Sequence, residues 1–395
     1  MPTVLHVSQP TEAGVATYVA GAAIDQKNRG WDVVVACPDG GELVDELANN
    51  GVAQVTWPAE RSPGPRTAIE VRRLRRVLDT VAPDVVHLHS SKAGLAGRLA
   101  IRGRLATIFQ PHAWSWLAAP RSMKAATLAW ERLAARWTSV YVCVCDGEAH
   151  AGRAYGVGGR YRVIPNGVDL KHFRSDAARN RRAARARLSI PPDAPVVACV
   201  GRVTKQKGQD TLLDAWSAVH VRCPEAMLAV VGGGDLLEPL RDQAPPNVRF
   251  VGPIADATPW YAAADVVALP SRWEGQPLTL LEAMAVGRSV VGSDIPGIGD
   301  TLPPDSGAAV TEGDSEALAD ALSHRLRHLE VARAEGAAAA RHAALAADVR
   351  CTYGHLATIT ARLAEKPGPH RTVHGRPRWM PDWLGSPRTR AGSSR

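Results

Sequence analysis

The sequence predicts an α/β protein made of two domains, each a doubly wound parallel sheet. The chain has 395 residues, which exceeds the usual size of a single domain. Short apolar runs alternate with helical stretches, and the alternation restarts after a proline-rich cluster at 191–195. We therefore expect two sheets that face each other across a cleft, with the ligand beyond the carboxyl ends of the strands.

The predicted strands are short runs rich in valine and other apolar residues. In the first half of the chain they are Val4–Val7, Asp32–Ala36, Val85–Leu88, Thr107–Phe109, Val140–Val144 and Val163–Ile164. In the second half they are Val196–Val200, Met227–Val231, Val248–Val251, Val266–Leu269 and Ser289–Gly292. An Arg- and Ala-rich stretch before the proline-rich cluster marks the boundary. The expected units are a first domain at 1–185, a second at 190–345, a terminal helix at 346–365 and a tail at 366–395.

The basic character of the chain is concentrated in the tail. This segment holds seven Lys or Arg residues and one Asp, so it carries +6 of the formal net charge of +8. It is rich in Pro, Gly and Ser, and we expect it to be disordered. Trp379 and Trp383 among its arginines would suit an anionic membrane surface, while a simple solvated tail is the alternative. No nucleic-acid-binding motif is present, so nucleic acid is not an expected partner.

The cysteines and the apolar runs bear on the compartment. The six cysteines form no Cys-x-x-Cys pair, and most lie in apolar runs such as Val142–Cys145. They are typical of small buried side chains in a reducing compartment, and no structural zinc site is expected. No apolar run is long enough to cross a bilayer, and the N-terminus lacks a signal pattern. We expect a cytoplasmic protein, either free or docked at the inner face of the cell membrane.

Two carboxylates flank a predicted helix start in the second domain. The apolar run Asp265–Pro270 predicts a buried strand, and a loop with Glu274 follows it. Pro277 suits the first position of a helix that contains Glu282, and Gly287 suits the residue after its end. The helix N-terminus would attract phosphate, and the carboxylates would accept sugar hydroxyls. The alternative is a capped core helix with two incidental glutamates.

A glycine turn with cations follows the first strand of the second domain. Backbone amides near Gly201, together with Arg202 and Lys207, would hold a pyrophosphate, and Lys205 is a weaker candidate. Negative charge develops when a nucleoside diphosphate departs, so cations here would stabilise the transition state more than the ground state. A solvated basic loop is the alternative.

Together these motifs resemble the group 1 glycosyltransferases of family 4, which are retaining enzymes with the GT-B fold. Glu274 and Glu282 match the family's Glu-seven-Glu signature, and Gly201–Asp210 matches its Gly-Arg…Lys-Gly-x-Asp pattern. The resemblance covers about residues 1–360. It implies two Rossmann-like domains, with the acceptor on the first and a nucleoside diphosphate sugar, UDP- or GDP-linked, on the second. It implies hexosyl transfer to a sugar or lipid-linked hydroxyl in polysaccharide or glycolipid synthesis, with no cofactor and no metal.

The resemblance also assigns individual residues. Glu274 would bind hydroxyls of the donor sugar, Arg202 and Lys207 its diphosphate, and His112 would orient the transferred sugar, although a lone histidine after a strand is usually structural. Glu282 would bind the ribose. The other expected donor-binding positions are Gly14, Gly201, Gly252, Pro253, Gly275, Gln276, Leu278 and Thr279. The family often has Gly-Phe-Gly where this chain has Gly275-Gln276-Pro277, and Pro277 has no N–H to offer, so the identity of the donor stays open.

Several first-domain features have two interpretations. His87 and His89 share one face of a strand and would suit a metal, but no third ligand is apparent in the sequence, and lining the acceptor side suits His89 better. Helix 67–81 is amphipathic and rich in arginine, and a basic segment after it contains Trp114, Trp116, Trp130 and Trp137. Core packing explains both segments. The alternative is that this domain rests on anionic lipid and takes a lipid-linked acceptor.

Two other functional classes remain open at this stage. An isomerase of similar fold would turn over a nucleotide sugar without an acceptor, but it should lack this glutamate spacing. A catalytically silent partner subunit should have lost Glu274, Arg202 or Lys207, and all three are present.

Overall fold

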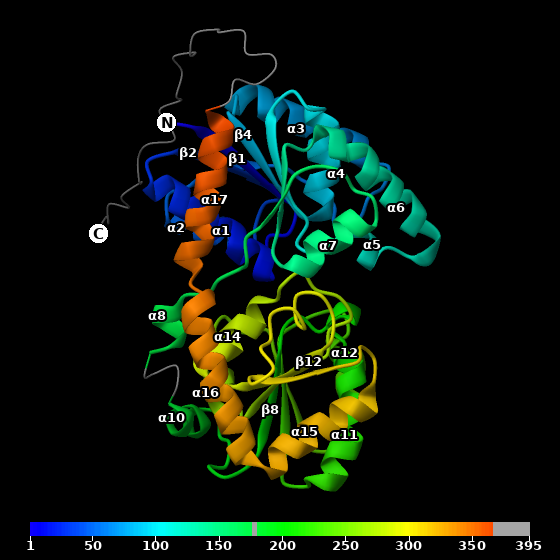
Figure 1. The fold of residues 1–395 in the computed structure, drawn as a ribbon, viewed down its shortest axis with the longest axis vertical. Coiled ribbons are helices and arrows are strands. Elements are labelled where there is room, and N and C mark those ends of the chain that lie inside the picture. Colours follow the sequence, from blue (N-terminus) through cyan, green and yellow to red (C-terminus); the bar gives the residue numbers. More distant parts are fainter. Residues whose placement is uncertain (176–179, 366–395) are drawn as a thin grey trace, which may run out of the picture.

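The computed structural model describes residues 1–175 and 180–365, which form two α/β domains stacked end to end (Figure 1). The predicted tail at 366–395 lies outside the described residues. Each domain holds one parallel sheet covered by helices on both faces, so the predicted fold class is confirmed. Among the described residues, no helix combines the length and the apolar character needed to cross a bilayer.

The first domain is built on a sheet with the strand order β3-β2-β1-β4-β5-β6-β7. Its central strands β1 and β4 are almost entirely buried because helices cover both faces of a parallel sheet, and they carry three buried histidines among apolar residues. The strands are β1 (Thr3–Ser8), β2 (Asp32–Cys37), β3 (Ala53–Thr56), β4 (Val85–His89), β5 (Ala106–Gln110), β6 (Val140–Cys143) and β7 (Tyr161–Val163). The helices are α1 (Ala13–Asn28), α2 (Glu42–Asn49), α3 (Thr67–Val81), α4 (Ser90–Ile101), α5 (Ser115–Ala118), α6 (Arg121–Ala134), the 3-10 turn η1 (Ala135–Trp137) and α7 (Asp146–Ala154).

The second domain repeats the plan with the strand order β10-β9-β8-β11-β12-β13. The strands are β8 (Val196–Val200), β9 (Met227–Val231), β10 (Val248–Gly252), β11 (Val266–Leu269), β12 (Ser289–Ser293) and β13 (Gly307–Val310). The helices are α8 (Leu170–Phe173), α10 (Arg181–Arg187), η2 (Lys205–Lys207), α11 (Gln209–Arg222), α12 (Leu237–Arg241), α13 (Thr258–Ala263), α14 (Leu278–Val286), α15 (Ser315–Arg327) and α16 (Leu329–Ala346). In α14, Pro277 caps the start and Gly287 ends the helix at φ 85°, as the sequence predicts.

The predicted strands are all present, with ends that differ by a residue or two, but the sequence analysis missed β3 and β13. Both lie at an edge of their sheet. Their residues are half-buried or exposed: β3 has Gln54 and Thr56 among its four residues, and β13 has only small residues before Val310. Neither segment has the run of large branched residues that marks a strand covered on both faces.

A terminal helix ties the two domains together. After α16 of the second domain, α17 (Val349–Ala364) returns to the first domain and packs on α1, β4 and β5 (Figure 1). Leu356 joins the apolar core of that domain, and the ring of Tyr353 packs edge-on against Tyr18 of α1. The return begins where Val168 pairs with Asp348 beside Gly167.

The basic segment after β5 is fixed from inside the domain. Arg98 of α4 is fully buried, pairs with Glu131 of α6 at 2.8 Å and stacks on Phe109. Trp114 and Trp116 stack on each other in the core with 1% and 2% exposure. Of the two interpretations of this segment, core packing holds for Trp114 and Trp116, so neither indole is available to lipid.

We expect Gly167→Ala to destabilise the protein by about 1–3 kcal/mol, because overpacking forces the backbone to shift. A Cβ at this position would lie 2.5 Å from both N and Cα of Val349, where α17 begins. Urea unfolding measures the loss. Gly158→Ala is the matched control because nothing lies within 4 Å of a Cβ there. Equal stability of the two variants would show that the Gly167 contact does not constrain the crossing.

Candidate active site

Two helix N-termini meet where the domains touch. Gly14 lies in the first turn of α1, and a Cβ built on it would be 3.7 Å from Cδ1 of Leu278, the first residue of α14. Helix N-termini carry partial positive charge and free amides. In addition, the buried hydroxyl of Thr279 in α14 has no hydrogen-bond partner among the described residues. The arrangement is suited to an anionic ligand with several acceptor oxygens.

Glu274 lies after β11 and is held by a set of donors. Lys207 Nζ lies 2.5 Å from its Oε1, and the hydroxyl of Ser271 donates to the same oxygen at 2.8 Å. Gln206 Nε2 lies 3.5 Å from Oε2 and donates to the carbonyl of Trp273 at 3.0 Å. The carboxylate is 8% exposed, so the ammonium group compensates a buried charge. The sequence predicted both Glu274 and Lys207 but not their direct contact.

Glycines let the loops of the second domain pack closely enough to form this pair. Gly208 follows Lys207 at φ 68°, and a Cβ on it would lie 2.0 Å from the carbonyl oxygen of Pro270. A Cβ on Gly232 would lie 2.1 Å from the carbonyl oxygen of Gly201, and Gly232 N–H donates to the carbonyl of Gly252 at 2.9 Å. Pro253 lies beside these loops, against Gly233. The predicted positions Gly201, Gly252 and Pro253 therefore share one end of the sheet.

Arg202 is the cation of this group that makes no side-chain hydrogen bond within the described residues. Burial lowers its pKa, and the nearby Arg61 of the first domain lowers it further. Glu274, Asp235 and Glu12 lie near enough to raise its pKa. Two neighbouring cations in a partly desolvated place favour an anionic ligand between the domains.

Glu282 lies within α14, the helix that follows the Glu274 loop. The hydroxyl of Tyr261 in α13 donates to its Oε2 at 2.7 Å. Burial raises the pKa of Glu282, and the hydrogen bond from Tyr261 opposes that shift. The second oxygen remains available to a ligand hydroxyl because no hydrogen bond occupies it within the described chain.

Gly275 brings the second domain into contact with His112. A Cβ on Gly275 would lie 3.0 Å from the backbone N of Ala113 and 3.1 Å from the carbonyl carbon of His112. The thiol of Cys145 donates to the carbonyl of Gly275 at 3.3 Å. The structure therefore places the backbone of the His112 loop against Gly275, the residue that follows Glu274.

Gln276 connects the domains through its side chain. Its Oε1 accepts a hydrogen bond from Asn166 N at 2.6 Å, and its carbonyl accepts one from Asn166 Nδ2 at 2.7 Å. Its Nε2 donates to Thr301 at 3.0 Å. The side chain is thus fully used, and only the backbone amide of Gln276 remains for the predicted donor-binding role.

His112 is held in a strained loop. Its φ is 52° and that of Ala113 is 87°, conformations that non-glycine residues rarely adopt and that cluster at functional sites. The carboxylate of Glu148 accepts hydrogen bonds from Ala113 N at 2.7 Å and Val144 N at 2.9 Å. Burial raises the pKa of Glu148 to about 7, although these two bonds oppose the shift. Glu148 is a positioning residue that the sequence analysis missed.

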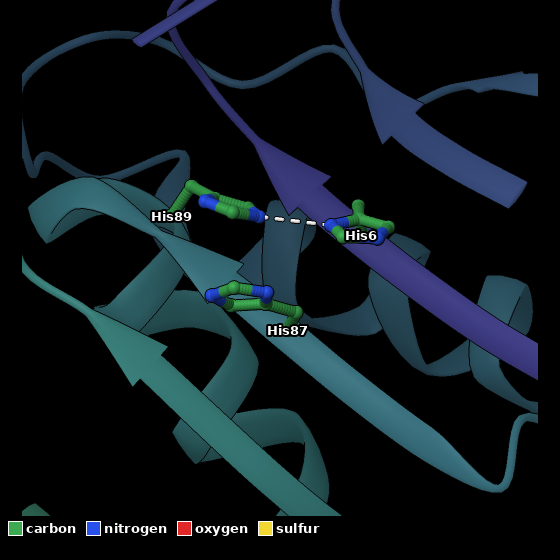
Figure 2. A group of neighbouring side chains, drawn as sticks. All are labelled: His6, His87 and His89. Atoms are coloured by element: carbon green, nitrogen blue, oxygen red, sulfur yellow. Dashed lines mark hydrogen bonds between the residues drawn. The ribbon is translucent and has the colours of Figure 1, made fainter. Parts of the chain in front are cut away.

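Three buried histidines form a group, shown in Figure 2, and one of them, His89, lies 3.2 Å from His112. His6 of β1 joins His87 and His89 of β4, and one ring nitrogen of each lies within 4.8 Å of the others. The sequence showed no third partner because His6 is distant in the chain. The rings of His87 and His89 are 3.9 Å apart and inclined by only 31°. Metal–nitrogen bonds of about 2.0–2.1 Å lie in the ring plane, so these two rings do not point at a common ion.

Two known families match the chain. The model "Glycosyltransferase Family 4" matches residues 13–172, and "Glycosyl transferases group 1" matches residues 194–328. A GDP-mannose-dependent alpha-(1-6)-phosphatidylinositol monomannoside mannosyltransferase of Mycobacterium tuberculosis is 31% identical over 356 residues, covering 83% of this chain and 89% of the relative. A UDP-Gal:alpha-D-GlcNAc-diphosphoundecaprenol alpha-1,3-galactosyltransferase of Escherichia coli is 29% identical over 286 residues, covering 68% of this chain and 73% of the relative.

Solved structures share the whole architecture. Anabaena HepE in complex with UDP and glucose superposes with a TM-score of 0.78 at 21% identity, covering 92% of this chain and 100% of HepE. Sucrose-phosphate synthase from Thermosynechococcus elongatus gives a TM-score of 0.79 at 23% identity, covering 92% of this chain and 99% of the synthase. The two sheets and their helices thus form the GT-B fold that the sequence predicts.

We expect the free energy of unfolding to fall as the pH drops from about 6.5 to about 4. Burial lowers the pKa of His6 to about 4 and that of His112 to about 3, so in the folded protein they stay neutral, while in the unfolded chain they take up protons near pH 6.5. Each of the two histidines lowers the free energy of unfolding by about 1.4 kcal/mol per pH unit in this window. Urea unfolding at several pH values gives the slope, which His6→Gln should reduce and His150→Gln, at an exposed position, should not. Equal slopes for all three proteins would contradict the expectation.

Proposed function

The chain belongs to the group 1 glycosyltransferases of family 4, and on this premise we propose that it transfers mannose from GDP-mannose to a lipid-linked sugar or inositol hydroxyl. The choice of donor and acceptor follows the mycobacterial relative, which is named for GDP-mannose and a phosphatidylinositol mannoside. UDP-sugars are the second class to test, because the E. coli relative is named for UDP-Gal and HepE was solved with UDP. Both curated relatives are named as transferases, so the isomerase is not favoured.

The contact between Glu274, Lys207 and the His112 loop carries the proposal. In the donor complex, the diphosphate would lie between Arg202, Lys207 and the N-terminus of α14, where amides and cations converge. The transferred sugar would then lie between Glu274 and His112, which adjoin across Gly275. Glu282 would accept a hydroxyl of the ribose.

Catalysis would come mainly from stabilising the leaving group. When the glycosyl–oxygen bond breaks, negative charge grows on the diphosphate, and Arg202 and Lys207, both near Glu274, would stabilise that charge. Little reorganisation is then needed during the reaction. We further propose retention of configuration, with the departing phosphate assisting deprotonation of the acceptor, and transfer without a metal ion or cofactor.

The outer side of α6 is the surface that we propose for contact with anionic lipid. Arg121 and Lys124 are exposed, Met123 between them is 54% exposed, and Leu117 and Leu133 nearby are 40% and 42% exposed. Basic side chains with apolar neighbours on an exposed helix suit a lipid surface. This face stays available although Trp114 and Trp116 are buried.

We expect Glu274→Gln and Glu274→Ala to lower transfer at least about 100-fold, since the transition state loses an ionic acceptor for the sugar. Glutamine can still accept from Ser271, so the fold and the binding of GDP should persist, as a thermal shift with GDP checks. Mannose transfer from GDP-mannose to a phosphatidylinositol mannoside, measured with and without EDTA, gives the rate. Glu225→Ala, an exposed change in the same domain, is the matched control. Unchanged turnover in both Glu274 variants would remove the site assignment.

We expect the protein to sediment with anionic vesicles at low salt and to dissociate at high salt, because screening weakens surface electrostatics. Arg121→Glu with Lys124→Glu should abolish this binding. Arg333→Glu with Arg341→Glu makes the same charge change on exposed residues of α16 and should bind as the wild type does. Equal loss in both double variants, or no sedimentation of the wild type at low salt, would exclude α6 as the lipid contact.

A further inference from the structure

His112 is the last member of a chain of side-chain hydrogen bonds that starts inside the first domain. Oε1 of Gln26 in α1 lies 2.9 Å from Nε2 of His6. Nδ1 of His6 lies 3.0 Å from Nε2 of His89, as the dashed line in Figure 2 shows. Nδ1 of His89 then lies 3.2 Å from Nε2 of His112. The chain crosses from a helix through two neighbouring strands to the loop at the domain interface.

We propose that this chain of hydrogen bonds holds His112 as the tautomer with its proton on Nε2. Nδ1 is then a fixed acceptor for a hydroxyl of the donor sugar. The proposal deepens the proposed function and rests on it, because it specifies how His112 would recognise the transferred sugar. His6, His89 and Gln26 are positioning residues, since they act through His112.

The direction of the chain follows from which atoms can donate. In the structure the amide of Gln26 presents its oxygen to His6 while its Nε2 has no partner among the described residues, and an oxygen only accepts. With this orientation of the amide, His6 carries its proton on Nε2. Burial keeps the pKa values of His6, His89 and His112 far below neutrality, so each ring has one proton. Nδ1 of His6 is then bare and accepts from Nε2–H of His89. By the same step, Nδ1 of His89 accepts from Nε2–H of His112.

The free nitrogen of His112 faces no protein donor. Nδ1 has no hydrogen-bond partner among the described residues, and the side chain is only half-buried. The loop that carries it lies against Gly275, beside Glu274. A sugar in this place would meet two acceptors, the carboxylate of Glu274 and the bare nitrogen of His112, and both require a hydroxyl that donates.

The surroundings keep the chain from being interrupted by water. His6 and His89 are fully buried. The ring of His87 lies against that of His89 with centroids 3.9 Å apart, and the rings of Tyr18 and His112 meet edge-on with centroids 5.1 Å apart. Gln26, His6 and His89 lie on a helix and on two strands of the sheet that it covers, so the part of the hydrogen-bond chain that leads to the His112 loop is rigid. His87 takes no part in the chain, since neither of its ring nitrogens hydrogen-bonds to His6, His89 or His112.

Nitrogen-15 NMR of the imidazole rings tests the assignment without any substrate. We expect wild-type protein labelled at histidine to show the Nε2–H tautomer for His6, His89 and His112 at pH 7.5. In His89→Phe, which keeps an aromatic ring but no nitrogen, His112 should become a mixture of tautomers. His89→Asn places an oxygen near the former Nδ1 and should restore the Nε2–H form. His87→Phe removes a neighbouring ring outside the chain and should leave the spectrum of His112 unchanged.

Transfer kinetics of the same variants test the role of the tautomer. We expect His89→Phe to lower kcat/KM about tenfold, the value of one hydrogen bond to the sugar, and His89→Asn to recover most of this loss. Thermal unfolding identifies any variant that fails to fold, and the comparison between Phe and Asn at one position separates the tautomer from simple packing.

Several results would overturn the proposal. These are an Nδ1–H or mixed tautomer of His112 in the wild type, an unchanged tautomer in His89→Phe, or an altered tautomer with unaltered transfer. Joint displacement of the signals of His6, His87 and His89 by stoichiometric Zn²⁺ would make the group a metal site and would also overturn it. A wild type that is inactive with every donor would defeat the proposed function instead, while the NMR assignment of the chain would stand.

Discussion

A side chain at position 275 would crowd the contact between the domains, because Ala113 N and a methyl group of Val144 lie 3.0 Å from where a Cβ would stand. This close approach sets the distance between the two domains at the point where Glu274 and His112 adjoin. The hydrogen bonds of Gln276 to Asn166, and of Gly147 N to Asp300, hold the same contact in place. Neither domain contains the site alone, so its geometry depends on how the domains are docked.

The charges at this contact are arranged to bind one kind of ligand. Lys207 compensates the buried Glu274. The guanidinium of Arg202 donates no hydrogen bond within the described chain, and its pKa is lowered by burial and by the positive charge of Arg61. Cations and helix amides thus lie beside carboxylates in a partly desolvated place, where electrostatic interactions are stronger than in water. A ligand that is anionic at one end and rich in hydroxyls at the other complements this pattern, as a nucleoside diphosphate sugar does.

The first domain contributes mainly rigidity, with Arg61 as a cation near the site. Its interior holds neutral histidines linked to Gln26 and His112, and the strained backbone at His112 is fixed by Glu148. Buried polar groups cost stability unless they are hydrogen-bonded, and unpartnered atoms remain on His87, Gln110 and Tyr18. Such a costly interior is reasonable if its purpose is to orient the side chain at the interface.

Features that depend on neighbouring residues could be predicted from the sequence, while features that join distant segments could not. Apolar runs predict the buried strands, Pro277 and Gly287 bound α14, and motif residues after strands are expected at one edge of a parallel sheet. The edge strands β3 and β13 were not predicted, because these half-exposed segments lack a run of large branched apolar residues. Partners such as His6 with His89 or Asn166 with Gln276 lie 83 and 110 residues apart. No local period connects such pairs, because strand order and domain docking bring them into contact.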